Sequence, residues 1–167
     1  MYMRWIAGEA DYSKLKLSGP FRVGYKDFKS AVFDNDCCVY YPAKNDGSGK
    51  QNVFFYSHGL QNLKGCEKAF LFFTRNEKIA GYFAMIMKPF MNVKLPVYRD
   101  ATVGLLYMQP VIVSHELTGN KTNHSAICME LASCGFCVFS LTHKDGSADY
   151  SPNLGHFDGN QEMFDFW

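Results

Sequence analysis

The sequence carries almost no excess charge of either sign. Its 17 Lys and Arg residues against 16 Asp and Glu residues give a formal net charge of +1. A general nucleic-acid binder needs a dense Lys/Arg face to neutralise phosphates. The charge balance therefore predicts that nucleic acid is not a partner.

Long apolar runs are also absent. No stretch reaches the ~18 apolar residues that a membrane-spanning helix requires, and the best one, residues 79–91, is interrupted by Lys88 and Pro89. Residues 1–11 lack the continuous apolar segment of a secretory signal. We therefore expect no transmembrane segment and a cytoplasmic location.

The six cysteines, at positions 37, 38, 66, 128, 134 and 137, lack the repeated spacing of a disulfide framework. Buried, reduced thiols are expected instead. Cys134 and Cys137 have thioredoxin-type spacing, but they follow a predicted helix, where its dipole raises the energy of a thiolate. A thiol-disulfide protein is therefore a distant third hypothesis. A zinc site with His143 would lack a fourth ligand, so no metal is expected.

The chain has 167 residues, of which 47% are hydrophobic and 20% charged. This composition is typical of a globular protein, and this length predicts one domain over residues 1–167. In the first half, residues 21–28 and 37–41 favour strands, which predicts an antiparallel hairpin. Residues 53–56 are compatible with a strand, and residues 66–73 and 77–87 with helices, although short apolar runs do not separate the two.

The third quarter predicts a parallel β-α-β unit. Residues 110–115 form a β-branched run of the kind buried on both faces of a sheet, and residues 136–141 are expected to form a second buried strand. Between them, Thr122 or Asn123 can cap a helix over residues 124–133, and Gly135 suits the left-handed position just beyond it. The crossover is expected to be right-handed. Residues 142–167 are polar and turn-rich without a recognisable helix, so the α/β fold is expected to be incomplete.

Several segments resemble one known family in order along the chain. The strongest similarity covers residues 109–148, including Ser114-His115-Glu116-Leu117-Thr118-Gly119 and His143-Lys144-Asp145-Gly146-Ser147-Ala148. Earlier segments that fit are residues 19–25, 40–43 and 94–98. On these residues the chain resembles the N-terminal part of the platelet-activating factor acetylhydrolase family.

The resemblance implies an incomplete α/β-hydrolase fold and a serine esterase that needs no cofactor. The family reaction releases a short sn-2 acyl group from a phospholipid-like substrate (1-alkyl-2-acetylglycerophosphocholine esterase). In such folds the loop after the third strand donates an N–H to the oxyanion hole, and the matching donor here is Leu117. In the same loop, after His115, Glu116 replaces the family glycine. Its Cβ and negative charge are expected to disfavour the oxyanion.

No catalytic residue is identifiable in the sequence. A nucleophile elbow requires Gly-x-Ser-x-Gly, and none of the eleven serines has both glycines. Ser57, in the half-motif Ser57-His58-Gly59-Leu60, is more simply a strand end. The leading hypothesis is therefore a phospholipid ester hydrolase, here truncated and inactive alone. The alternative is a non-catalytic binding or assembly protein with a protein partner at its open sheet edge.

Three histidines, at 115, 124 and 143, are expected near the carboxyl edge of the sheet, where α/β folds bind ligands. Without a nucleophile beside them, structural roles are expected, with His143 or Asp145 shaping the pocket mouth. The methionine-rich residues 81–91 could contact a membrane, but ordinary core packing is the favoured interpretation.

Overall fold

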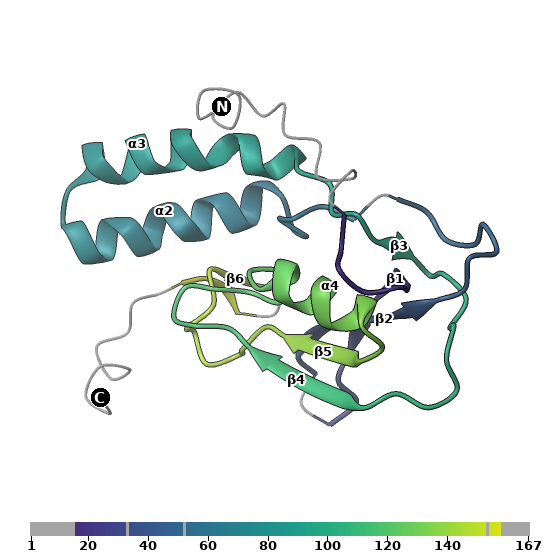
Figure 1. Ribbon diagram of the computed structural model, residues 1–167. Coiled ribbons are helices and arrows are strands. Elements are labelled where there is room, and N and C mark those ends of the chain that lie inside the picture. Colours follow the sequence, from purple (N-terminus) through teal and green to yellow (C-terminus); the bar gives the residue numbers. More distant parts are fainter. Residues whose placement is uncertain (1–15, 33, 52, 153, 158–167) are drawn as a thin grey trace.

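A five-stranded mixed sheet organises the chain (Figure 1), with strand order β3-β1-β2-β5-β4. The computed structural model describes residues 16–32, 34–51, 53–152 and 154–157. No helix in these ranges is long and apolar enough to cross a membrane.

The N-terminal half forms the predicted antiparallel hairpin. Strand β1 (Arg22–Lys29) pairs with β2 (Asp36–Ala43) along its whole length. Tyr25 and Tyr40 are fully buried, and their rings meet edge to face with centroids 5.1 Å apart. The short strand β3 (Tyr98–Arg99) extends the sheet beside β1 in the parallel sense.

The predicted parallel unit is confirmed. Strand β4 (Pro110–Ser114), helix α4 (Ser125–Ser133) and strand β5 (Cys137–Leu141) follow one another, and β4 pairs in parallel with β5. Helix α4 packs on β2, β5 and β1. Gly135 has φ 110° and ends the helix as expected. The α/β fold class, with an antiparallel hairpin leading into a parallel unit, is therefore the one that the sequence predicts.

The predicted cap of α4 is wrong. The residue before the helix is His124, and it makes no side-chain cap. Thr122 meets the start of the helix with its backbone instead, because its carbonyl accepts from the Ser125 N–H at 3.0 Å. Its hydroxyl is directed to the Phe55 carbonyl and the Asn120 side-chain oxygen.

The expectation that β4 is buried on both faces is also wrong. Its residues alternate between exposed and half-buried, and Ile112 is 74% exposed. The strand stands at the end of the sheet, with β5 as its one neighbour among the described strands. An edge strand of this kind leaves a row of backbone groups open to pairing.

Two helices form an antiparallel pair beside the sheet (Figure 1). Of the two alternatives left open for residues 66–73 and 77–87, the structure shows helices. They are α2 (Leu60–Thr74), which begins earlier than the apolar run, and α3 (Glu77–Met87), and the 3-10 helix η2 (Lys88–Asn92) follows. Phe70 and Phe83 stack between the two, with ring centroids 3.7 Å apart. Asn76 caps α3 by accepting from the N–H groups of Lys78 and Ile79.

Residues 53–56 do not form a strand. Phe54 makes an isolated bridge with Lys94, and the chain then turns into α2. Residues 53–56 instead pack beside the irregular segment that contains Leu95 and Val97. Val53 is buried with these two residues in the main core.

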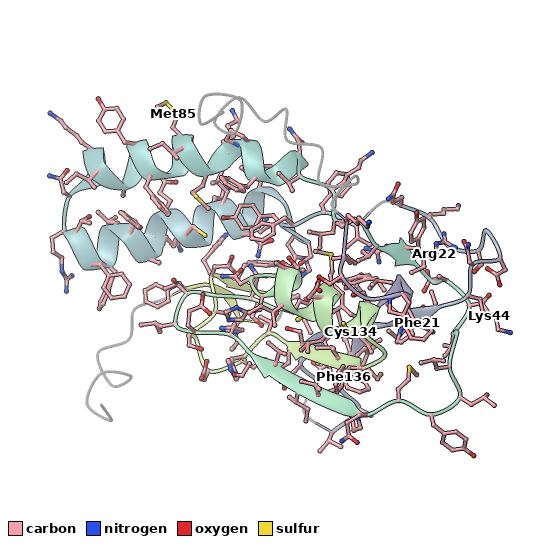
Figure 2. The ribbon with its side chains drawn as sticks, in the orientation of Figure 1. Phe21, Arg22, Lys44, Met85, Cys134 and Phe136 are labelled. Atoms are coloured by element: carbon pink, nitrogen blue, oxygen red, sulfur yellow. The ribbon has the colours of Figure 1, made fainter. Side chains whose placement is uncertain are left out.

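The core interpretation of residues 81–91 is wrong. Only Ala80 is buried in α3, whereas Tyr82, Met85 and Ile86 are each more than half exposed. Figure 2 shows Met85 on the side of α3 away from α2. The reason is that α3 packs mainly on α2 and η2 among the described elements, so its other face is largely uncovered there.

The main core lies between α4 and the sheet. It contains Val23, Tyr25, Cys38, Tyr40, Val53, Leu95, Val97, Cys128, Met129, Ala132 and Val138. The six cysteines are free thiols, but Cys134 is exposed, contrary to expectation, because it follows α4 in the turn before β5. Within residues 142–157 the polar tail has a two-stranded ladder, β6 (Tyr150–Ser151) with β7 (Gly155–His156), and no helix; residues 158–167 lie outside the described ranges.

Candidate functional site

The loop that follows β4 lies at the carboxyl edge of the parallel strands. Ser114 ends β4 and pairs with Leu141, which ends β5. His143 comes two residues later, so both chains leave the sheet at the same edge. In α/β folds this edge is where ligands bind.

Hydrogen bonds fold this loop into a tight turn around Leu117. The carbonyl of Glu116 accepts from the Gly119 N–H at 2.9 Å, and the Thr118 N–H donates to the Ser147 carbonyl at 2.6 Å. Within the described ranges, no acceptor is assigned to the Leu117 N–H. The predicted oxyanion donor is therefore available to an added acceptor.

Glu116 does not have the backbone geometry for which a glycine would be needed. The left-handed residue of the loop is Thr118, with φ 65°, whereas Glu116 has no positive φ. The Glu116 carboxylate lies 2.6 Å from Nε2 of His124. Burial opposes its ionisation, but its own N–H and His124 hold the pKa of Glu116 below the usual value. The backbone at residue 116 therefore accommodates a glutamate, and His124 partly balances the negative charge of its side chain.

The structure brings His115 and His143 together, with ring centroids 4.5 Å apart. The His143 N–H donates to Nε2 of His115 at 3.0 Å, and Nδ1 of His115 donates to the Glu116 carbonyl at 2.7 Å. Burial lowers the pKa of His115, and the nearby His143 also disfavours its charge. His115 is therefore a neutral, structural imidazole.

Asp145 lines a hollow of about 210 Å³ together with Lys144, Gly146, Ala148, Ser151, Leu154, Gly155 and His156. Its Oδ1 accepts from the N–H and hydroxyl of Ser147. Burial opposes ionisation, but these bonds and His143 keep the pKa of Asp145 below its usual value. His143 and Leu117 are not among the lining residues.

Sequence reasoning missed a buried charge cluster beneath the loop. Lys121 is 2% exposed, and its Nζ lies 2.8 Å from Asp27 and 2.7 Å from Asp36. Asp36 also contacts Nε2 of His58 at 2.8 Å, and Asp27 pairs with Arg99. Burial opposes both carboxylate charges, yet these partners lower the pKa values of Asp27 and Asp36. The cluster joins the loop after β4 to the hairpin.

A second buried carboxylate was also missed. Asp149 is 1% exposed and accepts from the side chains of Asn62 and Asn120 at 2.8–3.1 Å. The Tyr150 N–H donates to it as well. Burial raises the pKa of Asp149 to about 7 despite these donors. Asp149 thereby links α2, the loop after β4 and β6.

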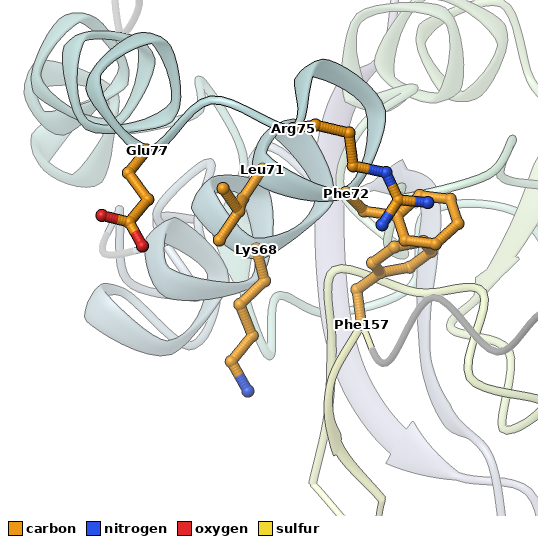
Figure 3. Close-up of a pocket in the computed structure, with 6 residues that line it drawn as sticks. All are labelled: Lys68, Leu71, Phe72, Arg75, Glu77 and Phe157. Atoms are coloured by element: carbon orange, nitrogen blue, oxygen red, sulfur yellow. The ribbon is translucent and has the colours of Figure 1, made fainter.

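A larger hollow of about 640 Å³ lies near the turn between α2 and α3 (Figure 3). It is lined by Lys68, Leu71, Phe72, Arg75, Glu77 and Phe157. Arg75 lies over the Phe72 ring, 4.7 Å from its centre. No residue of the loop after β4 lines this hollow. Among the described residues, no group of three His, Cys, Asp or Glu side chains could hold a metal ion.

An antiparallel hairpin leading into a parallel unit, with polar side chains at the carboxyl ends of its strands, defines an α/β protein. The chain belongs to the family described as platelet-activating factor acetylhydrolase, isoform II, whose family model matches residues 6–162. The resemblance found in the sequence is thereby confirmed.

Two individual proteins are similar to the chain. It is 28% identical to the platelet-activating factor acetylhydrolase of Cavia porcellus over 137 residues, which cover 80% of this chain and 29% of that protein. The chain thus spans less than a third of that relative's length. A solved ferulic acid esterase from Streptomyces cinnamoneus aligns with a TM-score of 0.49 and 12% identity, over 80% of this chain and 36% of its own.

Proposed function

We propose that this chain forms the oxyanion-binding wall of a phospholipid ester hydrolase. The reaction is the release of a short acyl group from the sn-2 position, as by a 1-alkyl-2-acetylglycerophosphocholine esterase. The observation that carries the proposal is the Leu117 N–H, which donates to no acceptor among the described residues and lies in a tight turn at the carboxyl edge of β4 and β5.

The mechanism that this wall supports is electrostatic. When a serine attacks an ester, the carbonyl oxygen becomes an oxyanion, and a preorganised N–H stabilises it more than it stabilises the substrate. The hydrogen bonds of Glu116 and Thr118, on either side of Leu117, fix the turn in which its N–H is presented. Glu116 is directed to His124, which reduces the repulsion that its charge would exert on the oxyanion.

The nucleophile is proposed to come from a Gly-x-Ser-x-Gly turn outside these 167 residues, since no serine of the sequence lies in that pattern. Among the described strands β4 pairs with β5 alone, so its other edge offers a place for a further strand to join the sheet. Acyl transfer through a serine requires no cofactor or metal.

A variant pair tests this role of Leu117 in the polypeptide that the intact reading frame encodes. Leu117→Pro removes the N–H, and Leu117→Ala keeps it. Loss of one oxyanion donor is expected to lower kcat by about 10²–10³-fold with little change in KM. Hydrolysis of 1-alkyl-2-acetylglycerophosphocholine provides the readout, and thermal unfolding checks that the proline variant folds. Equal kcat values for two folded variants would exclude Leu117 as the donor.

A second candidate function is non-catalytic assembly through β4. The specific observation is Ile112, which is 74% exposed in the middle of this edge strand. Under this alternative a protein partner pairs with β4, and Ile112→Lys abolishes the complex. A reading frame that continues into a nucleophile elbow, and a product that hydrolyses the ester, would favour the enzyme.

A further inference from the structure

Ser114 and His143 meet at the carboxyl ends of β4 and β5, and the oxyanion role of Leu117 does not use them. Ser114 is exposed, and its Oγ lies 2.7 Å from Nε2 of His143. A serine hydroxyl becomes a nucleophile when an adjacent imidazole takes its proton. Sequence inspection identified no nucleophile, because these two residues are separated by a strand, a helix and two loops.

The position of His143 is set by its neighbour. Its backbone N–H donates to Nε2 of His115, and the two rings meet edge to face. Nδ1 of His115 donates to the Glu116 carbonyl, so the hydrogen bonds of His115 are those of a neutral ring. His115 therefore places no positive charge beside the His143 ring.

A carboxylate belongs to the same loop. Asp145 follows His143 by two residues, and its Oδ1 accepts from the N–H and the hydroxyl of Ser147. Serine, histidine and an acidic residue thus occur in the loops at the carboxyl ends of β4 and β5.

We propose that Ser114 and His143 form a nucleophilic dyad that accepts acyl groups from small activated esters. Nε2 of His143 takes the Ser114 proton while Oγ bonds to the acyl carbon. The carbon–oxygen bond to the alcohol breaks, and the alcohol leaves with that proton. Water then attacks the acyl-serine with His143 as base, which releases the acid and restores the serine.

An exposed dyad favours a small substrate. Ser114 and His143 share an exposed hydrogen bond, and neither lines the hollow of about 210 Å³ that Asp145 helps to form. That hollow therefore gives a long acyl chain on Ser114 no enclosure, and we expect acetyl esters with a good leaving group to be the substrates.

Labelling of the unaltered chain tests this dyad without any variant. A fluorophosphonate is expected to form an adduct on Ser114, in which the serine oxygen bonds to phosphorus and fluoride leaves. Peptide mass spectrometry identifies the site. His143→Gln keeps a hydrogen-bonding side chain but removes the base, so the labelling rate should fall at least about 100-fold. Hydrolysis of 4-nitrophenyl acetate should fall in parallel.

Ser48→Ala provides the matched control, since Ser48 lies in a turn and bonds to the Thr102 N–H instead of a histidine. Its labelling should equal that of the unaltered chain. An adduct on another serine, no adduct, or an unchanged rate in folded His143→Gln would overturn the dyad. The assay uses this chain alone, so its outcome is separate from phospholipid hydrolysis by the whole reading-frame product.

Discussion

Lys121 is the residue on which the position of the loop after β4 depends most directly. Its ammonium lies between Asp27 of β1 and Asp36 of β2 and is almost fully buried. Desolvating charges is costly unless they are paired, and here each partner is within 2.8 Å. The pairing therefore holds the start of the loop–helix connection against the hairpin.

Removal of this charge should be strongly destabilising. Lys121→Met leaves two largely buried carboxylates without their shared cation, which is expected to cost about 3–5 kcal/mol of unfolding free energy. Urea unfolding with an unchanged slope gives the value. In the triple variant with Asp27→Asn and Asp36→Asn, part of the loss should return. A loss below about 1 kcal/mol in Lys121→Met would show that the cluster adds little.

Asp149 predicts an unusual pH dependence of stability. Burial raises its pKa from 3.8 to about 7, so between these values the folded chain binds a proton that the unfolded chain does not. The stability from this group is therefore full below pH 3.8 and lost as pH rises toward 7. Thermal unfolding at pH 5 and pH 8 measures this, and Asp149→Asn, which does not titrate, should lack that component. Identical pH profiles for the two proteins would refute it.

At the scale of elements, the neighbouring helices α2 and α3 each contain a glycine, and the space around the two glycines differs. Gly65 lies in α2, where an added Cβ would come 1.7 Å from the Asp149 carbonyl oxygen. Gly81 lies in α3, where a Cβ would meet nothing within 4 Å. The first glycine allows α2 to approach the chain at Asp149, and the second only weakens its helix.

The two alanine variants should therefore change stability in opposite directions. Gly65→Ala is expected to cost at least about 1–3 kcal/mol because a backbone atom must move. Gly81→Ala should add about 0.5–1 kcal/mol because alanine loses less conformational entropy in a helix. Chemical denaturation compares them under the same conditions. Equal and small effects would mean that α2 does not lie against Asp149 as described.

Sequence patterns were sufficient for elements whose signal is local. The parallel unit over residues 110–141 and the hairpin had β-favouring runs and turn residues, whereas the runs at residues 66–73 and 77–87 were compatible with helices but did not exclude strands. The exposure of individual apolar side chains was not predictable. Ile112 and Met85 are exposed, and their residue types do not indicate whether another element covers them. Lys121 pairs with Asp36 at 85 positions' separation and with Asp27 farther still, and no local pattern encodes such pairings.

The whole molecule presents a functional edge and two surfaces that lack neighbours among the described residues. The Leu117 turn, the Ser114–His143 pair and the hollow beside Asp145 belong to the loops at the carboxyl ends of β4 and β5. The outer edge of β4 and the outer face of α3 are the uncovered surfaces. The loops and the uncovered edge of β4 are therefore the parts of the molecule on which the proposed function depends.

A crystal structure of the whole reading-frame product with an organophosphate bound to its reactive serine tests the central claim most directly. The phosphoryl oxygen imitates the oxyanion of ester hydrolysis. We expect this oxygen about 2.7–3.1 Å from the backbone nitrogen of Leu117. A phosphoryl oxygen held by other donors, with Leu117 turned away from it, would contradict the account.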